Sequence, residues 1–424
     1  ALSHLDWPHI SEAEDPVHQL FKGDPAALYG DRMTEKSRNT CRRETQRLAD
    51  WFGTSETEIA HACITLANEH IGDVQREHIG FYLLEKEGAA ELRQYLNARH
   101  GRIRLWIHHH RETVQYTVMG IANIAAAVLV LLLGYAPWLL ALFLPIWSVG
   151  LHTLINCITR RFFPSSPRLQ LNVSEITEEC RTLLVLPCTL TEPAQAVHMV
   201  RQLLTAREAC PPGAIDCLLL SDYTACMTCQ SGGDTAIVSA VQQAISVLDA
   251  PTRHFFYMQR QRAWNEKRRC FAPRGGRHGA LDALNHLLAD GMCSDTFDAA
   301  TIPPNTLHRR YAYVLSIRED TLPIPDSLTS LIGLLAHPLN QRIQTRHGAK
   351  GISILCPRLA CRLHTNDKTL ALMQHEEQYN EYPGIHLFEG VGLYHPAALL
   401  ESTAEQLPKT GSMTLSMLEG LLAG

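Results

Sequence analysis

The sequence lacks an excess of charge of either sign. Its 38 basic and 43 acidic side chains give a formal net charge of -5 at neutral pH. A chain that binds nucleic acid over much of its surface is usually basic, so this balance gives no overall sign of a nucleic-acid partner, and none is expected. Internal repeats and low-complexity segments are also missing. With 424 residues, the chain is long enough for two or three domains with buried cores.

Regular cysteine spacing is missing as well, and no signal peptide opens the chain. The 13 cysteines do not form the pattern of a small disulfide-rich secreted scaffold, so the parts outside any membrane are expected to be cytoplasmic and reduced. The nearest approach to a metal site is "CMTC", residues 226 to 229, with Cys210 and Cys217 upstream. Its spacing fits no firm zinc template, and packing in a strand explains Cys217, so a structural role is favoured over zinc.

Charged side chains are absent from residues 113 to 158. As one helix this segment would be ~69 Å long, about twice a ~30 Å hydrocarbon core, so it must fold back. The break at "GYAPW", residues 134 to 138, predicts two transmembrane spans, near 114 to 133 and 138 to 158. Basic residues flank both outer ends: Arg102, Arg104 and Arg111 before, and Arg160, Arg161 and Arg168 after. Both ends are therefore expected in the cytoplasm.

Two alternatives are weighed for this region. The charge-free segment could be a buried hairpin in a soluble protein, but its length favours the membrane. His108, His109 and His110 could bind a metal, yet consecutive helical residues do not share a face, so a place at the headgroup interface is favoured.

Three regions follow from this organisation. Residues 1 to 106 have apolar groups at helical spacing and predict a helical domain, in which Ser55 and Glu58 have capping-box spacing. Residues 107 to 168 form the membrane hairpin. Residues 169 to 424 alternate strand-like and helical runs, which predicts an α/β domain with a mostly parallel sheet. The strand-like runs are 181 to 190, 215 to 225, 254 to 265 and 311 to 317, with helical runs at 194 to 208 and 278 to 291 between them.

Acidic side chains follow two of these strands. Asp222 ends the second strand, and Arg318, Glu319 and Asp320 follow the fourth. Ligands of open α/β sheets bind at the carboxyl ends of the strands, so a metal, a phosphate or a sugar is expected here, against the plainer reading of a solvated strand end. In a nucleotide-sugar site the first Asp can hold the base or ribose, while the second cluster binds Mg²⁺ or Mn²⁺.

The order and spacing of several motifs resemble the glycosyltransferase part of cyclic β-1,2-glucan synthases, and the likeness runs nearly end to end. The motifs are "DPAALYGDRMT" and "HIGFYLL" in the helical domain, "PRLQLNVSEITEECRTLLVLP" after the hairpin, then "RQRAWN", "LAHPLN", "GISILCPRL", "GVGLYHPAAL" and "LEG". The resemblance implies a GT-A type α/β fold behind an N-terminal helical domain and a two-helix transmembrane hairpin. It also implies transfer of glucose from UDP-glucose to a glucan acceptor at the bacterial inner membrane, as a multi-pass protein with cytoplasmic domains, alongside other envelope-glucan components.

Site residues are expected on the same basis. The nucleotide-sugar contacts are Asp222, Arg260, Arg262, Trp264, Arg274, Arg277 and Arg318, and the metal ligands are Asp320 and Glu319. Trp264 could stack on the sugar or base, against the plainer reading of a solvated strand end. Counting back from "GVG" also aligns Tyr379 with a tyrosine of the family, which makes it a candidate for glucan attachment.

Several charged family positions are changed in this chain. The family's Asp-Ala-Asp-Thr is Arg318-Glu319-Asp320-Thr321 here, and two family lysines become Ala280 and Val391. The family's general-base Asp is missing from the shortened "LSMLEG", where Glu419 is the nearest carboxylate and the candidate catalytic residue. Loss of such a base typically lowers the rate by about 10²–10⁴-fold.

Three readings therefore stand. The first is a membrane-bound glycosyltransferase, impaired or not. The second is an inactive pseudo-glycosyltransferase that binds a nucleotide sugar or assists assembly in the cell envelope. The third is a fragment of a longer protein without a function of its own.

Overall fold

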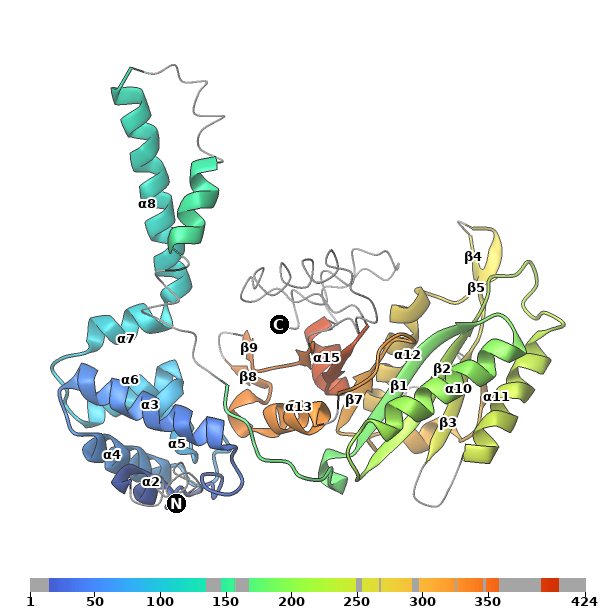
Figure 1. Cartoon of the computed structure of the whole chain (residues 1–424), viewed down its shortest axis with the longest axis horizontal. Helices are drawn as coiled ribbons and strands as arrows, with labels where there is room; N and C mark the ends of the chain where they lie inside the picture. The colour runs from blue at the N-terminus through green and yellow to red at the C-terminus, as the bar shows by residue number, and fades with distance from the viewer. Residues whose placement is uncertain are drawn as a thin grey trace, which may run out of the picture. The chain divides into compact units, whose positions relative to one another are not determined.

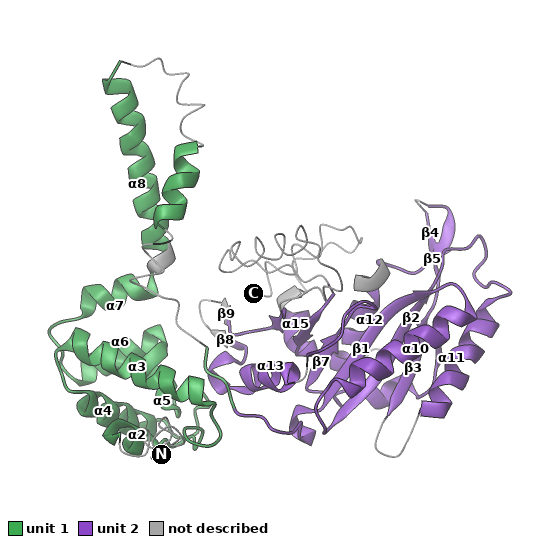
Figure 2. Cartoon of the chain, viewed as in Figure 1, with its two compact units in different colours: residues 1–171 green, residues 172–424 purple. Residues whose placement is uncertain are grey.

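The computed structural model describes residues 15–134, 146–155, 157, 168–248, 254–266, 268–291, 297–324, 326–345, 348–357 and 390–403. It divides the chain into two compact units, residues 1–171 and 172–424, which Figure 2 shows in green and purple. The three regions expected at 1 to 106, 107 to 168 and 169 to 424 stay a prediction.

Unit 1 is helical over its described residues. Its helices include α2 (Pro16–Phe21), α3 (Glu35–Phe52), α4 (Glu56–Glu69), α5 (Ile79–Leu84), α6 (Lys86–Tyr95), α7 (Arg102–His109) and α8 (Arg111–Leu132) (Figure 1). The capping box is confirmed at the start of α4. The Ser55 hydroxyl accepts a hydrogen bond from the Glu58 amide at 3.2 Å, and the Glu58 carboxylate accepts one from the Ser55 amide at 3.1 Å.

Two of the family-like motifs meet inside unit 1. The buried Asp24 carboxylate of "DPAALYGDRMT" lies 2.8 Å from Nδ1 of the buried His78, the first residue of "HIGFYLL". The same carboxylate accepts hydrogen bonds from the amides of Ile79 at 3.0 Å and Leu28 at 3.3 Å. Since a buried carboxylate needs such partners, these motifs lock the loop before α3 onto the start of α5.

One helix in the described part of the chain is long and apolar enough to cross a membrane. It is the segment Thr113–Leu132 of α8, and none of it is buried inside the structure. A second apolar helix, Ile146–Ile155, is too short in its described part to span a ~30 Å hydrocarbon core. The expected two-span hairpin is thus not shown, and residues 135–145, 156 and 158–167 lie outside the described residues.

Unit 2 is built on a seven-stranded mixed sheet in the order β10-β11-β7-β1-β2-β3-β6. The strands β1 (Thr182–Leu190), β2 (Ile215–Tyr223), β3 (Phe255–Arg260) and β7 (Tyr313–Ser316) are parallel. The strand β6 (Phe297–Ala300) runs antiparallel to β3, β11 (Gly392–Tyr394) runs antiparallel to β7, and β10 (Ile354–Leu355) runs antiparallel to β11. The predicted α/β domain with a mostly parallel central sheet is confirmed.

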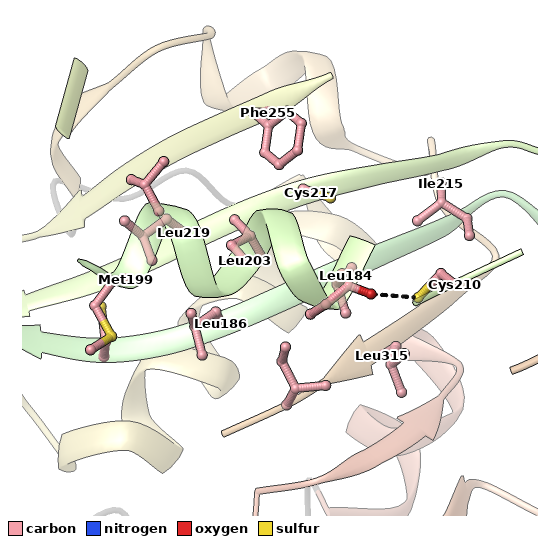
Figure 3. Close-up of a cluster of buried hydrophobic side chains, with 14 of the residues drawn as sticks. Leu184, Leu186, Met199, Leu203, Cys210, Ile215, Cys217, Leu219, Phe255 and Leu315 are labelled. Atoms are coloured by element: carbon pink, nitrogen blue, oxygen red, sulfur yellow. Dashed lines mark hydrogen bonds between the residues drawn. The ribbon is translucent and has the colours of Figure 1, made fainter. Parts of the chain in front are cut away.

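Helices cover both faces of this sheet. Alternate residues of the parallel strands pack against α10 (Pro193–Glu208), α11 (Asp234–Leu248) and α13 (Ser327–Ala336), while the residues between them pack against α12 (Gly276–Asp290) and α15 (Pro396–Thr403). Figure 3 shows the first of these layers, in which Leu184, Leu203 and Leu219 meet and the Cys210 thiol donates to the Ala206 carbonyl at 3.2 Å. Buried leucines of β1, α10 and β2 thus pack against one another in this layer.

Short elements complete unit 2. Two hairpins are formed by β4 (Ala263–Asn265) with β5 (Cys270–Ala272) and by β8 (Ile343–Thr345) with β9 (Gly348–Lys350), and single 3₁₀ turns are η2 (Glu178–Cys180), η3 (Pro304–Leu307) and η4 (Pro338–Asn340). The strand-like run expected over 254 to 265 is in fact two strands, because β3 ends at Arg260 and β4 begins at Ala263.

Candidate functional site

The strand order reverses between β1 and β7. The chain passes from β1 to β2 and β3 on one side, whereas β7 pairs with β1 on the other side and is followed by β10 and β11 farther out. In open α/β sheets ligands bind outside the carboxyl ends of the strands at such a reversal. The candidate site is therefore this edge of unit 2, which we call the carboxyl edge: the ends of β1, β2, β3 and β7 and the loops that follow them.

The strand register places the two predicted acidic positions at this edge. Asp222 lies opposite Thr189 near the end of β1, and Ser316 at the end of β7 lies opposite Val185. Strands β2 and β7 flank β1, so they lie about 10 Å apart, at ~4.8 Å per neighbouring pair. The turn that holds Arg318, Glu319 and Asp320 follows β7 directly. Asp222 and this turn thus belong to one edge of the sheet.

Asp222 is bound by Arg260 on the neighbouring strand β3. The guanidinium donates from Nε to Oδ1 and from Nη2 to Oδ2, both at 2.7 Å, and both side chains are almost fully buried. Burial raises the pKa of the Asp222 carboxyl, and the hydrogen bonds and charge of Arg260 offset part of that rise. Asp222 and Arg260 were both predicted to contact the nucleotide sugar. The structure brings them together, but they bind each other.

The same arginine holds the start of α12. Its Nη1 donates to the Arg274 carbonyl at 2.6 Å, in the loop that leads into that helix. A Cβ at Gly279 would lie 2.0 Å from the Arg274 carbonyl oxygen and 2.9 Å from Arg260 Nη1. Glycine is therefore required there, because any side chain would push the first turn of α12 away from the carboxyl edge.

Arg262 forms a second buried clamp. Its guanidinium donates to both oxygens of Asp234 at the start of α11, at 2.6 and 3.0 Å, to the Thr224 carbonyl at 2.6 Å and to the Cys229 carbonyl at 3.2 Å. It also lies 4.4 Å from the centre of the Tyr223 ring. The hydrogen bond from Arg262 keeps the pKa of Asp234 below its usual range. Arg262 thus fixes the loop between β2 and α11.

That loop carries "CMTC". The backbone of Cys226 pairs with Phe271 of β5, with hydrogen bonds of 2.9 and 2.8 Å, and its thiol lies 3.4 Å from the Thr228 hydroxyl. Among the residues that the structure describes, no group of three or more His, Cys, Asp or Glu side chains is arranged to hold a metal. The backbone pairing joins this loop to β5, and the preference for a structural role over zinc stays a prediction.

The remaining predicted contacts of this region are placed as follows. Trp264 is half exposed on β4, with its ring edge-on to Phe271 at 5.2 Å between centres. Arg274 is exposed at the entrance to α12, and Arg277 lies in the first turn of that helix, where only its backbone is described. Trp264 and Arg274 are therefore accessible groups next to the carboxyl edge.

Arg318 and Asp320 pair with each other in the turn after β7. The guanidinium donates from Nε to Oδ1 at 3.1 Å and from Nη2 to Oδ2 at 2.7 Å, and the Thr321 hydroxyl donates to Oδ1 at 3.2 Å. Partial burial alone would raise the pKa of Asp320, but these hydrogen bonds and the charge of Arg318 bring it below its usual range. The pair is solvent-accessible, with 33% of the Arg318 side chain and 59% of the Asp320 side chain exposed.

This pairing bears on the expected divalent cation. Mg²⁺ and Mn²⁺ bind carboxylate oxygens, and both oxygens of Asp320 already accept from Arg318. In its described arrangement Asp320 does not offer the free carboxylate that such an ion needs. The assignment of Asp320 and Glu319 as metal ligands stays a prediction.

Sequence reasoning missed several residues at this edge. Thr189 is exposed beside Asp222, and the backbone and hydroxyl of Thr191 donate to Gln195 at 3.0 and 2.8 Å. No charge marks these positions, so only the strand order could reveal them.

The "GVGLYHPAAL" motif forms β11 and α15, and its Gly390 carbonyl accepts from the Ser316 hydroxyl at 2.8 Å. Glu419 and Tyr379 lie outside the described residues.

Comparison with known proteins adds one finding. No family model matches the chain. The chain is 26% identical over 467 aligned residues to the cyclic beta-(1,2)-glucan synthase NdvB of Rhizobium meliloti (strain 1021). The alignment covers the whole of this chain but only 16% of that relative's length. The chain is therefore a distant homologue of a glucan synthase, and it corresponds to a small part of it.

Proposed function

We propose that unit 2 is the GT-A type domain of a membrane-bound glycosyltransferase that moves glucose from UDP-glucose onto a growing β-1,2-glucan. The observation that carries the proposal is the carboxyl edge, where the strand order reverses between β1 and β7. Polar groups from β2, β3, α12 and the turn after β7 gather at that edge. The distant similarity to a glucan synthase supports the choice of donor and acceptor.

The residues have different parts in this proposal. The Asp222–Arg260 pair braces the ends of β2 and β3 and positions the start of α12. Arg274 and the backbone amides of the first turn of α12, where no side chain of the N-cap residue Gly275 caps the helix, are suited to the diphosphate, because helix N-termini and guanidinium groups both favour anions. Trp264 is suited to stack on the base or sugar, and Glu419 is the candidate general base. A divalent cation would add positive charge beside the diphosphate, with Asp320 and Glu319 as its ligands.

The second candidate function is an inactive pseudo-glycosyltransferase that binds a nucleotide sugar or assists assembly in the cell envelope. The observation that favours it is the bidentate Arg318–Asp320 pair, which ties up the carboxylate that the family resemblance assigns to metal binding. A fold that keeps its core and neutralises its ligand carboxylates would retain binding more readily than turnover.

Titration calorimetry and radiolabelled transfer on the detergent-purified full chain separate these possibilities. Binding of UDP and UDP-glucose together with incorporation of labelled glucose into glucan supports the enzyme. Binding without incorporation supports the pseudoenzyme. Failure to bind either nucleotide, with EDTA or with excess Mn²⁺, rejects the enzyme and the nucleotide-sugar-binding form of the pseudoenzyme. Arg274→Gln is expected to weaken UDP binding by about tenfold or more, as for one lost charged hydrogen bond. Arg201→Gln, on the exposed side of α10, is the matched control.

The membrane part of the proposal is a helical hairpin in the bacterial inner membrane, made by α8 and the apolar segment after it, with the helical domain before α8 and unit 2 in the cytoplasm. The exposed apolar surface of α8 supports it, since none of the span Thr113–Leu132 is covered by the rest of the structure. Retention of the full chain in membranes after alkaline carbonate extraction is the expected result. Release into the supernatant would contradict the proposal.

A further inference from the structure

The helix α7 turns an apolar face outward. Ile103 is 73% exposed and Trp106 is 53% exposed, whereas Leu105 is buried. At ~100° per residue, Trp106, Ile103 and Ile107 occupy one arc of about 100° on the helix surface. The flanks of that arc are Arg102 on one side and Arg104 on the other, both exposed. We call this surface the outer face of α7.

The opposite side of α7 is fixed to the helical domain. Gly101, just before the helix, has a φ of 85°, and a Cβ there would lie 2.7 Å from the Phe52 ring. His108 packs edge-on against the Trp51 ring at 5.5 Å and lies 3.3 Å from the Arg47 guanidinium. His108 thus contacts the helical domain, and the headgroup position favoured from the sequence stays a prediction. Because both ends of α7 are held, its outer face has a defined orientation.

That orientation is set relative to α8. Only His110 separates α7 from α8, and α8 leaves at a steep angle to α7, while α3 to α6 lie on the other side of α7 (Figure 1). When α8 stands along the bilayer normal, α7 therefore lies along the membrane plane. Its buried Leu105 side is turned toward the helical domain, so its outer face is turned toward the membrane.

We propose that the outer face of α7 docks on the headgroup region of an anionic bilayer, with Trp106, Ile103 and Ile107 at the edge of the acyl chains and Arg102 and Arg104 against lipid phosphates. Amphipathic helices with tryptophan on the apolar face and basic flanks bind such surfaces. Two features favour the bilayer over a second copy of the chain: the helix is continuous with a candidate span, and its flanking charges are both positive. The inference rests on the membrane role proposed above for α8.

The test uses the full chain in nanodiscs and measures tryptophan fluorescence. The contribution of Trp106 to the fluorescence is obtained by subtracting the spectrum of Trp106→Phe from that of the unmodified chain. The contribution of Trp51, which lies in the same domain but faces α7, is obtained in the same way from Trp51→Phe. Each is measured in phosphatidylglycerol discs whose acyl chains carry bromine near the headgroups, and in the same lipid without bromine. The expected result is strong quenching of the Trp106 signal by shallow bromine and little change of the Trp51 signal.

The remaining outcomes are equally decisive. Equal, weak quenching of both signals would overturn the proposal. A Trp106 signal that shifts with protein concentration in detergent and ignores bromine would assign the outer face to a second copy of the chain and overturn it as well. Weaker quenching of the Trp106 signal in phosphatidylcholine discs than in phosphatidylglycerol discs supports binding to anionic lipid. Weaker quenching in the double variant Arg102→Gln, Arg104→Gln supports it as well. Equal quenching in the two lipids rejects a preference for anionic lipid. Carbonate extraction tests α8 separately, so failure of the span is distinguishable from failure of α7 to dock.

Discussion

Arg260 and Asp222 form a bidentate ion pair across the neighbouring parallel strands β3 and β2, with both hydrogen bonds at 2.7 Å and both side chains buried. This aspartate, near the carboxyl end of β2, is thus an internal brace. The arginine passes the constraint on to α12 through the Arg274 carbonyl. The pair sets the shape of the carboxyl edge rather than offering it a free carboxylate.

Breaking this pair from one side should be far more costly than replacing both partners. Asp222→Asn leaves the Arg260 charge buried without its counter-ion and should lower the free energy of unfolding by about 3–5 kcal/mol. The double variant Asp222→Leu, Arg260→Met removes both charges and should recover much of that loss. Denaturant unfolding of the full chain in detergent measures both, and additive losses in the double variant would contradict the coupling.

Removing Arg318 should create metal affinity at the turn after β7. Arg318→Ala frees both oxygens of Asp320 and takes away the guanidinium that donates to them at 3.1 and 2.7 Å, so Mn²⁺ should bind about tenfold more tightly. Electron paramagnetic resonance of Mn²⁺ measures this without any nucleotide. Adding Asp320→Asn to the variant should abolish the gain. If the unmodified chain binds Mn²⁺ as tightly as Arg318→Ala does, the Arg318–Asp320 pair opens readily and the prediction is wrong.

Loss of the Arg262 clamp should loosen the loop between β2 and α11. Arg262→Gln removes the ion pair with Asp234 and weakens the hydrogen bonds to the Thr224 and Cys229 carbonyls, so amides over 224 to 231 should exchange with solvent at least about tenfold faster. Hydrogen exchange read by mass spectrometry measures this. The exposed Arg268→Gln, on the neighbouring β-turn, is the control and should leave those amides unchanged.

Acid should weaken unit 1 through Asp24. Burial would raise the pKa of this carboxyl, but the hydrogen bond and charge of His78 and the amides of Ile79 and Tyr29 bring it below its usual range. A carboxyl whose pKa is lower in the folded state stabilises the fold above its unfolded pKa of about 3.9, and that contribution is lost as the pH falls through the folded value. Asp24→Asn should therefore cost about 1–3 kcal/mol at pH 7.

The penalty of that substitution should begin to shrink below about pH 4, where the carboxyl of the unfolded chain takes up a proton, and should be lost once the pH has fallen through the lower pKa of the folded state. Thermal unfolding of both chains at pH 7 and pH 3, followed by circular dichroism, measures the difference. A penalty that is the same at both pH values would show that Asp24 acts without its charge. Asp31→Asn, in the same loop, provides the control.

The sequence by itself determined several of the strands and helices of both units. The apolar runs at 181 to 190 and 215 to 225 became β1 and β2, and the alternating helical run became α10, because burial on both faces of a parallel strand demands a continuous hydrophobic stretch. The capping box at Ser55 and the charge-free span Thr113–Leu132 of α8 were equally legible, since both depend on neighbouring residues. The motif "RQRAWN" was recognisable too, but not the break inside it that separates β3 from β4.

Only the tertiary structure decided what the charged residues do. Arg260 meets Asp222 from 38 positions away, and Arg262 meets Asp234 from 28 positions away. His108 meets Trp51 across two helices of unit 1. A charge at a strand end looks the same in sequence whether it faces solvent, a ligand or another side chain. Its partner depends on strand register and helix packing, which bring distant segments together, and burial then makes an unpaired charge too costly to persist.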